Sequence, residues 1–154
     1  MTSIRIPGLQ GLLCALALLF IATPDRALAE GGEHASSRWR LVNFWSEWCA
    51  PCRKEIPMLN ALSAELAAHA IEVVGVNFDD SPRAETLQIA ARLGIEFPIL
   101  SRDELSTLRL RPPDVMPTTY ILAPGDKTVG SLIGLQTRDA IVARLRQLGA
   151  LERL

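Results

Sequence analysis

Compact apolar runs alternate along the chain with longer segments in which apolar residues recur every three or four positions. The runs at 39–45, 71–78 and 118–122 are rich in β-branched and aromatic residues, which favours buried strands. The segment 49–69 has helical spacing and predicts an amphipathic helix, which Pro57 should kink because proline cannot donate to the i−4 carbonyl. The expected buried stripe of this helix consists of Ile56, Leu59, Leu62 and Leu66.

Turn and capping residues set the boundaries of the segments between the second and third strands. Ser81 is expected to be a helix N-cap with Pro82 at the first helical position, and Gly94 is expected to end that helix. An extended piece at 97–100 and a short helix at 103–110 should follow. The pattern therefore predicts two helices in this part of the chain.

The C-terminal part predicts a β-hairpin and a final helix. The segment 124–127 has the composition of a tight turn, so the strand at 118–122 should return antiparallel through 128–133. Thr137 is expected to cap the last helix. The expected buried face of that helix consists of Ile141, Leu145 and Leu148.

The order of these elements predicts the fold class. Two strands joined by a long helix form a βαβ-type unit, so the first two strands should be parallel, whereas the strands of the closing hairpin should be antiparallel. The economical arrangement is an α/β domain whose mixed central sheet has roughly four to five strands, with helices on both faces.

The N-terminal segment has the features of an export signal. Arg5 precedes an apolar run at 11–22, which is shorter than the roughly 20 residues that span a bilayer as a helix. We expect residues 1–29 to be a cleaved signal peptide, with an N-terminal membrane anchor through 11–22 as the alternative. Residues 30–38 should form a linker and 39–154 the folded domain. The expected location is the periplasm or another extracytoplasmic space.

Charge and cysteine content restrict the function classes. The net charge is −1 and the Lys and Arg residues are scattered, so no basic cluster indicates a nucleic-acid partner. Of three cysteines in the chain, only Cys49 and Cys52 belong to the expected domain. In an oxidising compartment such a pair either rests as a disulfide or is kept reduced by a dedicated electron supply.

The sequence Trp48-Cys49-Ala50-Pro51-Cys52 carries the candidate chemistry. Two thiols at this spacing can alternate between dithiol and disulfide. Cys49 should lie at the N-terminus of the following helix, where the helix dipole and free N–H groups favour a thiolate. A purely structural disulfide is the alternative, but so short a loop removes little chain entropy.

Two motifs occur in order along the domain. The first, at 43–57, reads NFWSEWCAPCRKEIP, and the second, at 115–120, reads VMPTTY and precedes the third strand. Together they resemble the thioredoxin superfamily, and most of all its exported TlpA/ResA-like branch, over nearly the whole domain. The resemblance implies a thioredoxin fold in which Cys49 attacks a client disulfide and Cys52 resolves the mixed disulfide.

The resemblance implies roles for further residues. Pro117 resembles the cis-proline of the family, which would present the Met116 backbone to an extended client peptide. An ordinary turn proline is the alternative. Trp48 is expected to shield Cys49 and to contact the client, with simple packing as the alternative.

Glu55 is a candidate proton carrier. It follows Cys52 by three residues on the same helix, so the two side chains share a face. A partly buried carboxylate there could exchange protons with the cysteine pair and tune its pKa, as the resemblance also implies; a solvated helix carboxylate is the alternative. Asn43 stands where cytoplasmic thioredoxins carry a buried aspartate. Because asparagine cannot titrate, the proton-relay duty of that aspartate would be either absent or moved, with Glu55 as the candidate.

The resemblance implies an exported thiol–disulfide oxidoreductase that works mainly as a reductant. Its electrons would come from a membrane donor of the thiol-transfer type. Its clients would be proteins with reducible disulfides, such as apocytochrome c or copper-site assembly proteins. No organic cofactor or metal is implied, and zinc is discounted because His34 and His69 lack a recognised ligand spacing with the cysteines.

Two other functions stay open at this point. The first is a disulfide oxidant or isomerase, although such relatives usually insert a helical subdomain before the cis-proline, and residues 79–116 are too few for a full one. The second is a non-catalytic copper- or partner-binding module of the same fold. The presence of both cysteines argues against an inactive version.

Overall fold

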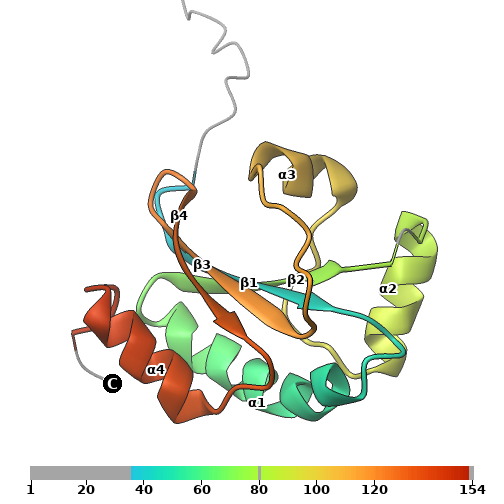
Figure 1. The fold of residues 1–154 in the computed structure, drawn as a ribbon, viewed down its shortest axis with the longest axis horizontal. Helices are drawn as coiled ribbons and strands as arrows, with labels where there is room; N and C mark the ends of the chain where they lie inside the picture. The colour runs from blue at the N-terminus through green and yellow to red at the C-terminus, as the bar shows by residue number, and fades with distance from the viewer. Residues whose placement is uncertain (1–35, 80, 153–154) are drawn as a thin grey trace, which may run out of the picture. The chain divides into compact units, whose positions relative to one another are not determined.

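The computed structural model describes residues 36–79 and 81–152, which form an α/β domain (Figure 1). Its strands are β1 (Trp39–Trp45), β2 (Ile71–Asn77), β3 (Thr118–Ala123) and β4 (Lys127–Ile133). Its helices are α1 (Ala50–Ala67), α2 (Arg83–Arg92), α3 (Arg102–Thr107) and α4 (Arg138–Gln147). All of these elements belong to one compact unit.

A four-stranded mixed sheet with the order β2-β1-β3-β4 lies at the centre. β1 runs parallel to β2, and β3 runs antiparallel to both β1 and β4. The predicted parallel pair and the predicted hairpin are therefore confirmed. The extended piece at 97–100 is attached beside β2 by a parallel bridge between Gly75 and Ile99.

Each face of the sheet buries its own apolar cluster, because side chains alternate along a strand. Leu41 and Trp45 of β1 pack on one face with residues of α1, α2 and α4. Val42 and Phe44 pack on the other face, together with Leu108 at the end of α3. Figure 1 shows α3 on the opposite side of the sheet from α1 and α4. The predicted α/β class with helices on both faces is confirmed.

α1 continues through Pro57, and Cys49 caps its N-terminus. Its predicted stripe is buried, with every member at most 2 % exposed: Ile56, Leu59, Leu62 and Leu66. Burial of one such side chain contributes about 1.5–3 kcal/mol, so this stripe holds α1 against the sheet.

The start of α2 corrects the predicted capping. Pro82, not Ser81, is the N-cap, and no side chain caps this helix. Pro82 has a ψ of 149°, an extended value, so it lies just outside the helix rather than at its first position. Ser81 instead accepts a hydrogen bond at its backbone carbonyl from the Thr86 hydroxyl, at 3.3 Å.

α3 is displaced from its predicted range of 103–110. It begins earlier because Ser101 and Glu104 form a capping box, in which each side chain accepts the other residue's backbone N–H. It ends at Thr107, and Arg109 then takes a left-handed conformation with a φ of 51°.

The predicted N-cap of α4 is confirmed, but its buried face differs in part from the predicted one. The Thr137 side chain accepts a backbone N–H of the first turn at 3.2 Å. Ile141 and Leu145 are buried, but Leu148 is only half-buried because it lies beyond the last helical residue, at the C-cap. Val142 takes the third buried position.

The described chain begins at Ser36, which is held by the turn between β3 and β4. The Ser36 N–H donates to Asp126 Oδ2 at 2.9 Å, and the Gly125 N–H donates to the Ser36 carbonyl at 2.7 Å. The predicted signal peptide or anchor at 1–29, with its apolar run at 11–22, lies outside the described residues. Within 36–79 and 81–152, no helix is long and apolar enough to cross a membrane.

Candidate active site

The two cysteines of the motif form a disulfide at the N-terminus of α1. Their Cα atoms are 5.3 Å apart. Cys49 is the N-cap, and its Sγ accepts the Cys52 backbone N–H at 3.3 Å. A sulfur in this position faces the positive end of the helix dipole, which stabilises a thiolate once the disulfide is reduced. The predicted placement of Cys49 at the helix start is confirmed.

Cys49 lines a hollow of about 480 Å³ on the surface. Among the described residues that line it, Cys49 is present and Cys52 is not. Both side chains are nearly buried, at 4 % exposed for Cys49 and 2 % for Cys52, so the hollow and not the exposed fraction distinguishes them. The remaining lining residues come from the loops around the cysteines: Trp48, Ala50, Pro51, Phe78, Pro113, Asp114, Val115 and Met116. A client disulfide that enters this hollow would therefore meet Cys49 first.

The Met116–Pro117 peptide bond is cis, as the motif predicts. Met116 lines the hollow beside Cys49, whereas Pro117 is buried at the start of β3. The Pro117 carbonyl accepts the Gly134 N–H at 2.8 Å, which ties this segment to the end of β4. The structure thus brings Met116 to the cysteine pair, and its contact with a client peptide stays a prediction.

Trp48 is 64 % exposed, so packing in the core is not its role. Its indole Nε1–H donates to Asp79 Oδ1 at 2.9 Å, and the Ser46 hydroxyl donates to Asp79 Oδ2 at 2.7 Å. No role was predicted for Asp79 from the sequence, so this contact was missed. A signal existed, because Asp79 follows β2 closely and the C-terminal ends of parallel strands meet at one edge of the sheet.

Glu55 is 1 % exposed, so it is not a solvated helix carboxylate. Its Oε1 accepts the Gln136 backbone N–H at 2.9 Å, and its Oε2 accepts the Asn43 amide N–H at 3.1 Å. Burial raises the pKa of Glu55 above its ordinary value of 4.5, and the two hydrogen bonds act in the opposite direction. A carboxyl in this balance is suited to hold a proton near the cysteine pair.

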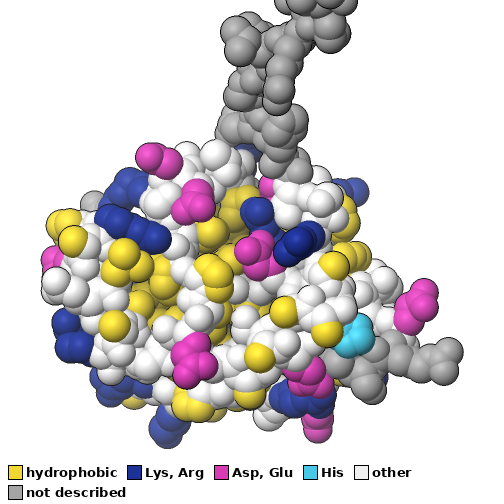
Figure 2. Space-filling view, turned by 180° about the vertical axis from the view of Figure 1, so that it is seen from behind, with side chains coloured by type: hydrophobic (Ala, Val, Ile, Leu, Met, Phe, Trp, Pro, Cys, Tyr) yellow, Lys and Arg dark blue, Asp and Glu magenta, His cyan; other side chains and the backbone are white. Residues whose placement is uncertain are grey.

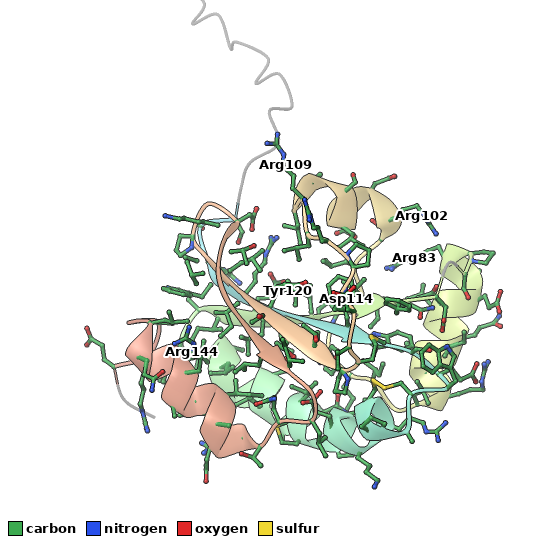
Figure 3. All side chains as sticks on the ribbon, viewed as in Figure 1. Arg83, Arg102, Arg109, Asp114, Tyr120 and Arg144 are labelled. Atoms are coloured by element: carbon green, nitrogen blue, oxygen red, sulfur yellow. A yellow bond between two sulfur atoms is a disulfide. The ribbon has the colours of Figure 1, made fainter. Side chains whose placement is uncertain are left out.

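A second and larger hollow, of about 720 Å³, lies beside the cysteine hollow and shares Phe78 with it. Its walls include Phe44, Leu100 and Leu105. Figure 3 shows Arg83 and Arg102 in the region between α2 and α3, on the same side of the molecule. This hollow contains neither cysteine, so the chemistry belongs to the smaller one.

A metal site was also sought among the side chains of the described residues. Within 36–79 and 81–152, no group of three or more His, Cys, Asp or Glu is arranged to hold a metal ion. His34 lies outside these ranges. Thiol–disulfide exchange needs a reactive thiolate, a second thiol within reach and a group that can carry a proton. Cys49 at the helix N-cap, Cys52 and the buried carboxyl of Glu55 meet these three needs.

Two curated relatives support this chemistry. The thiol-disulfide oxidoreductase ResA of Geobacillus thermodenitrificans is 29 % identical over 131 residues, which cover 81 % of this chain and 75 % of the relative. The thiol-disulfide oxidoreductase ResA of Bacillus subtilis is 29 % identical over 100 residues, which cover 65 % of this chain and 55 % of the relative.

Solved structures agree with the fold. A secreted thiol-disulfide isomerase from Corynebacterium glutamicum is 26 % identical, with a TM-score of 0.55, and the match covers 70 % of this chain and 68 % of that one. StoA from Bacillus subtilis is 20 % identical, with a TM-score of 0.57, over 69 % of this chain and 81 % of that one. Residues 31–125 match the AhpC/TSA family. The chain therefore belongs to the AhpC/TSA family of the thioredoxin superfamily, as a thiol–disulfide oxidoreductase with a CxxC pair.

Proposed function

We propose that this protein is an exported reductant of disulfides in client proteins. One observation carries the proposal: Cys49 caps α1 and lines an open hollow, while Cys52 lies one turn behind it. This arrangement separates the attacking sulfur from the resolving sulfur. The names of the ResA relatives support the same class of reaction.

The reaction follows in two exchange steps. The Cys49 thiolate attacks one sulfur of the client disulfide, and the other client sulfur leaves as a thiolate that takes up a proton. The Cys52 thiolate then attacks Cys49 within the mixed disulfide and releases the second client thiol. The client gains two electrons and two protons, and the Cys49–Cys52 disulfide forms. A membrane donor of the thiol-transfer type then reduces that disulfide for the next cycle.

Glu55 serves this reaction as the proton carrier for Cys52. The buried resolving thiol must lose its proton before it attacks, and Glu55 lies one turn away on the same face of α1. Because Cys52 is 2 % exposed, bulk water has little access to take up its proton directly.

An oxidant or isomerase is the second candidate, since one structural relative bears the name of a secreted isomerase. The described segments between β2 and Pro117 hold only the short helices α2 and α3. That part of the chain gives no support for the helical subdomain that oxidants and isomerases usually insert. We therefore propose the reductant as the first candidate function. Its proposed clients are apocytochrome c and copper-site assembly proteins.

A trapping experiment tests the exchange mechanism. Cys52→Ser should leave Cys49 able to attack but unable to resolve, so clients should accumulate as mixed disulfides in the native host. The Cys49→Ser, Cys52→Ser double variant is the matched control and should capture none. Absence of covalent partners on Cys52→Ser at normal expression would refute the mechanism.

The direction of electron flow needs its own measurement. For a reductant, rapid acid quenching and thiol alkylation in growing cells should find the cysteine pair mostly as dithiol. A pair found mostly as disulfide would favour the oxidant.

Export is tested separately. A reporter enzyme that is active only after export is fused after residue 38 and should be active if the predicted signal works. An inactive reporter would contradict export.

A further inference from the structure

Glu55 is held by a buried chain of hydrogen bonds that begins in β3. The Asn43 amide Nδ2 lies 3.1 Å from Glu55 Oε2 and 2.9 Å from Thr119 Oγ1. Both N–H groups of the amide are therefore engaged, one by the carboxylate and one by the hydroxyl. The three side chains are at most 2 % exposed, so bulk water does not compete for these contacts.

The sheet register places these groups together. Asn43 of β1 and Thr119 of β3 are directly paired in the antiparallel ladder, so their side chains lie side by side on one face. That face carries the cluster in which α1 packs, and α1 brings Glu55 to the amide. The contact therefore depends on three elements that meet only in the folded domain.

We propose that Thr119 is a positioning residue for disulfide exchange, whose hydroxyl orients the Asn43 amide so that its N–H₂ group faces Glu55. The proposal rests on the proposed role of Glu55 as proton carrier. An amide rotated by half a turn would place Oδ1 against Oε2, and two facing acceptors disfavour an ionised carboxylate. In the orientation that the structure shows, the Thr119 oxygen accepts one N–H of the amide while the other N–H donates to Glu55 Oε2, and that donation makes the Glu55 proton easier to release.

The groups that face Glu55 from the packed elements are uncharged. The Gln136 backbone N–H contacts Oε1 from the segment after β4, and β1 and β3 contribute the amide and the hydroxyl. On α4, Arg138 pairs with Glu65 of α1 and with Asp139. Along α1, Cys49 and Cys52 form a disulfide, which does not titrate in the oxidised protein. A change at Thr119 should therefore reach Glu55 through the amide alone.

The test is an NMR titration of the Glu55 carboxyl carbon in the oxidised full chain labelled with ¹³C-glutamate. The Glu55 signal is assigned from its loss in Glu55→Gln. Thr119→Val keeps the shape of the side chain without the hydroxyl, and the titration midpoint should rise by roughly 0.5–1 pH. Thr119→Ser keeps a hydroxyl and should restore the wild-type midpoint.

Thr86→Val is the matched control, because it removes the hydroxyl of another buried, hydrogen-bonded threonine, on α2. Its midpoint should equal that of the wild type. An unchanged midpoint in a folded Thr119→Val, or an equal rise in both valine variants, would overturn the proposal. If Thr119→Val does not fold, Thr119→Ala is measured under the same expectation. The titration needs no client, so a failure to reduce clients would reject the proposed function and leave this result standing.

Discussion

At the scale of single residues, burial and hydrogen bonding have opposite effects on the pKa of Glu55. Burial raises its pKa, and the N–H donors of Gln136 and Asn43 oppose the rise. A folded pKa above the unfolded one means that the native state binds this proton more tightly than the unfolded chain does. The stabilising contribution is therefore complete below a pH of about 4.5 and is lost as the pH rises through the raised folded pKa.

Glu55→Gln should remove this pH dependence, because glutamine cannot ionise. As the pH rises from below 4.5 through the raised folded pKa, the oxidised variant should lose less unfolding free energy than the wild type, by about 1.4 kcal/mol for each pH unit that separates the folded pKa from the unfolded one. Denaturant unfolding at a series of pH values measures the difference. Glu85→Gln, at an exposed position of α2, is the control and should keep the wild-type slope. Equal slopes for Glu55→Gln and the wild type would contradict the prediction.

At the scale of elements, close packing beside β2 depends on Gly75. A Cβ at this position would lie 2.7 Å from Ile99 Cδ1, 2.8 Å from Trp45 Nε1 and 2.9 Å from Phe97 Cε2. Real Cβ atoms do not approach other atoms so closely, so the bridge from β2 to the 97–100 segment requires a glycine.

Gly75→Ala should lower the free energy of unfolding by about 1–3 kcal/mol, as expected for overpacking in a tight core. Gly130→Ala on β4 is the matched control, since the three atoms nearest to its Cβ would all belong to the guanidinium of Arg144. The end of this flexible side chain can move away, so the free energy of unfolding should change by about 0.5 kcal/mol or less. Denaturant unfolding of the two oxidised variants measures both values. An equal loss of unfolding free energy in both variants would contradict the claim that close contacts at position 75 require a glycine.

The loop from β1 to α1 is ordered by the Asp79 carboxylate, which has one oxygen for Ser46 and one for Trp48. Asp79→Asn leaves a single acceptor oxygen, so the indole N–H of Trp48 should exchange with solvent about two to five times faster, as measured by NMR. Asp103→Asn makes the same charge change at an exposed position of α3 and should have no effect. Unchanged exchange in Asp79→Asn would remove this residue from the site.

The sequence predicted the elements well where a local signal was strong. The cysteine motif, the cis-proline, the stripe of α1 and the Thr137 cap all follow from spacing or from a motif. The partners of Glu55 and Trp48 come from segments far away in the chain, so no local pattern predicted them. The start of α2 was predicted wrongly because a serine followed by a proline is the usual pattern of an N-cap and a first helical residue, whereas the extended ψ of Pro82 makes the helix begin one residue later.

At the scale of the whole molecule, the described surface is mixed in charge. On the face drawn in Figure 2, Lys and Arg are interspersed with Asp and Glu, and hydrophobic side chains are visible across the middle. This agrees with a net charge of −1 for the chain. Such a surface fits transient contact with protein clients better than the electrostatic binding of a nucleic acid.

A catalyst of disulfide exchange must stay folded in both redox states. The Cys49–Cys52 disulfide joins residues only three positions apart, so its loss frees little chain entropy. Reduction should lower the free energy of unfolding by about 2 kcal/mol or less. Denaturant unfolding with and without a reductant measures this, and the double Cys→Ser variant shows whether the reductant acts elsewhere. Unfolding on reduction would contradict a redox cycle.

The attachment of Ser36 to the β3–β4 turn fixes the distance between the start of the described chain and the cysteine pair. Ser36 precedes the first residue of β1, while the cysteines follow its last, and the strand has seven residues. At about 3.3 Å per residue, the length of β1 puts about 20 Å between its two ends. Ser36 and the reactive sulfur of Cys49 therefore lie near opposite ends of β1, so a label attached near Ser36 would stand well away from the disulfide.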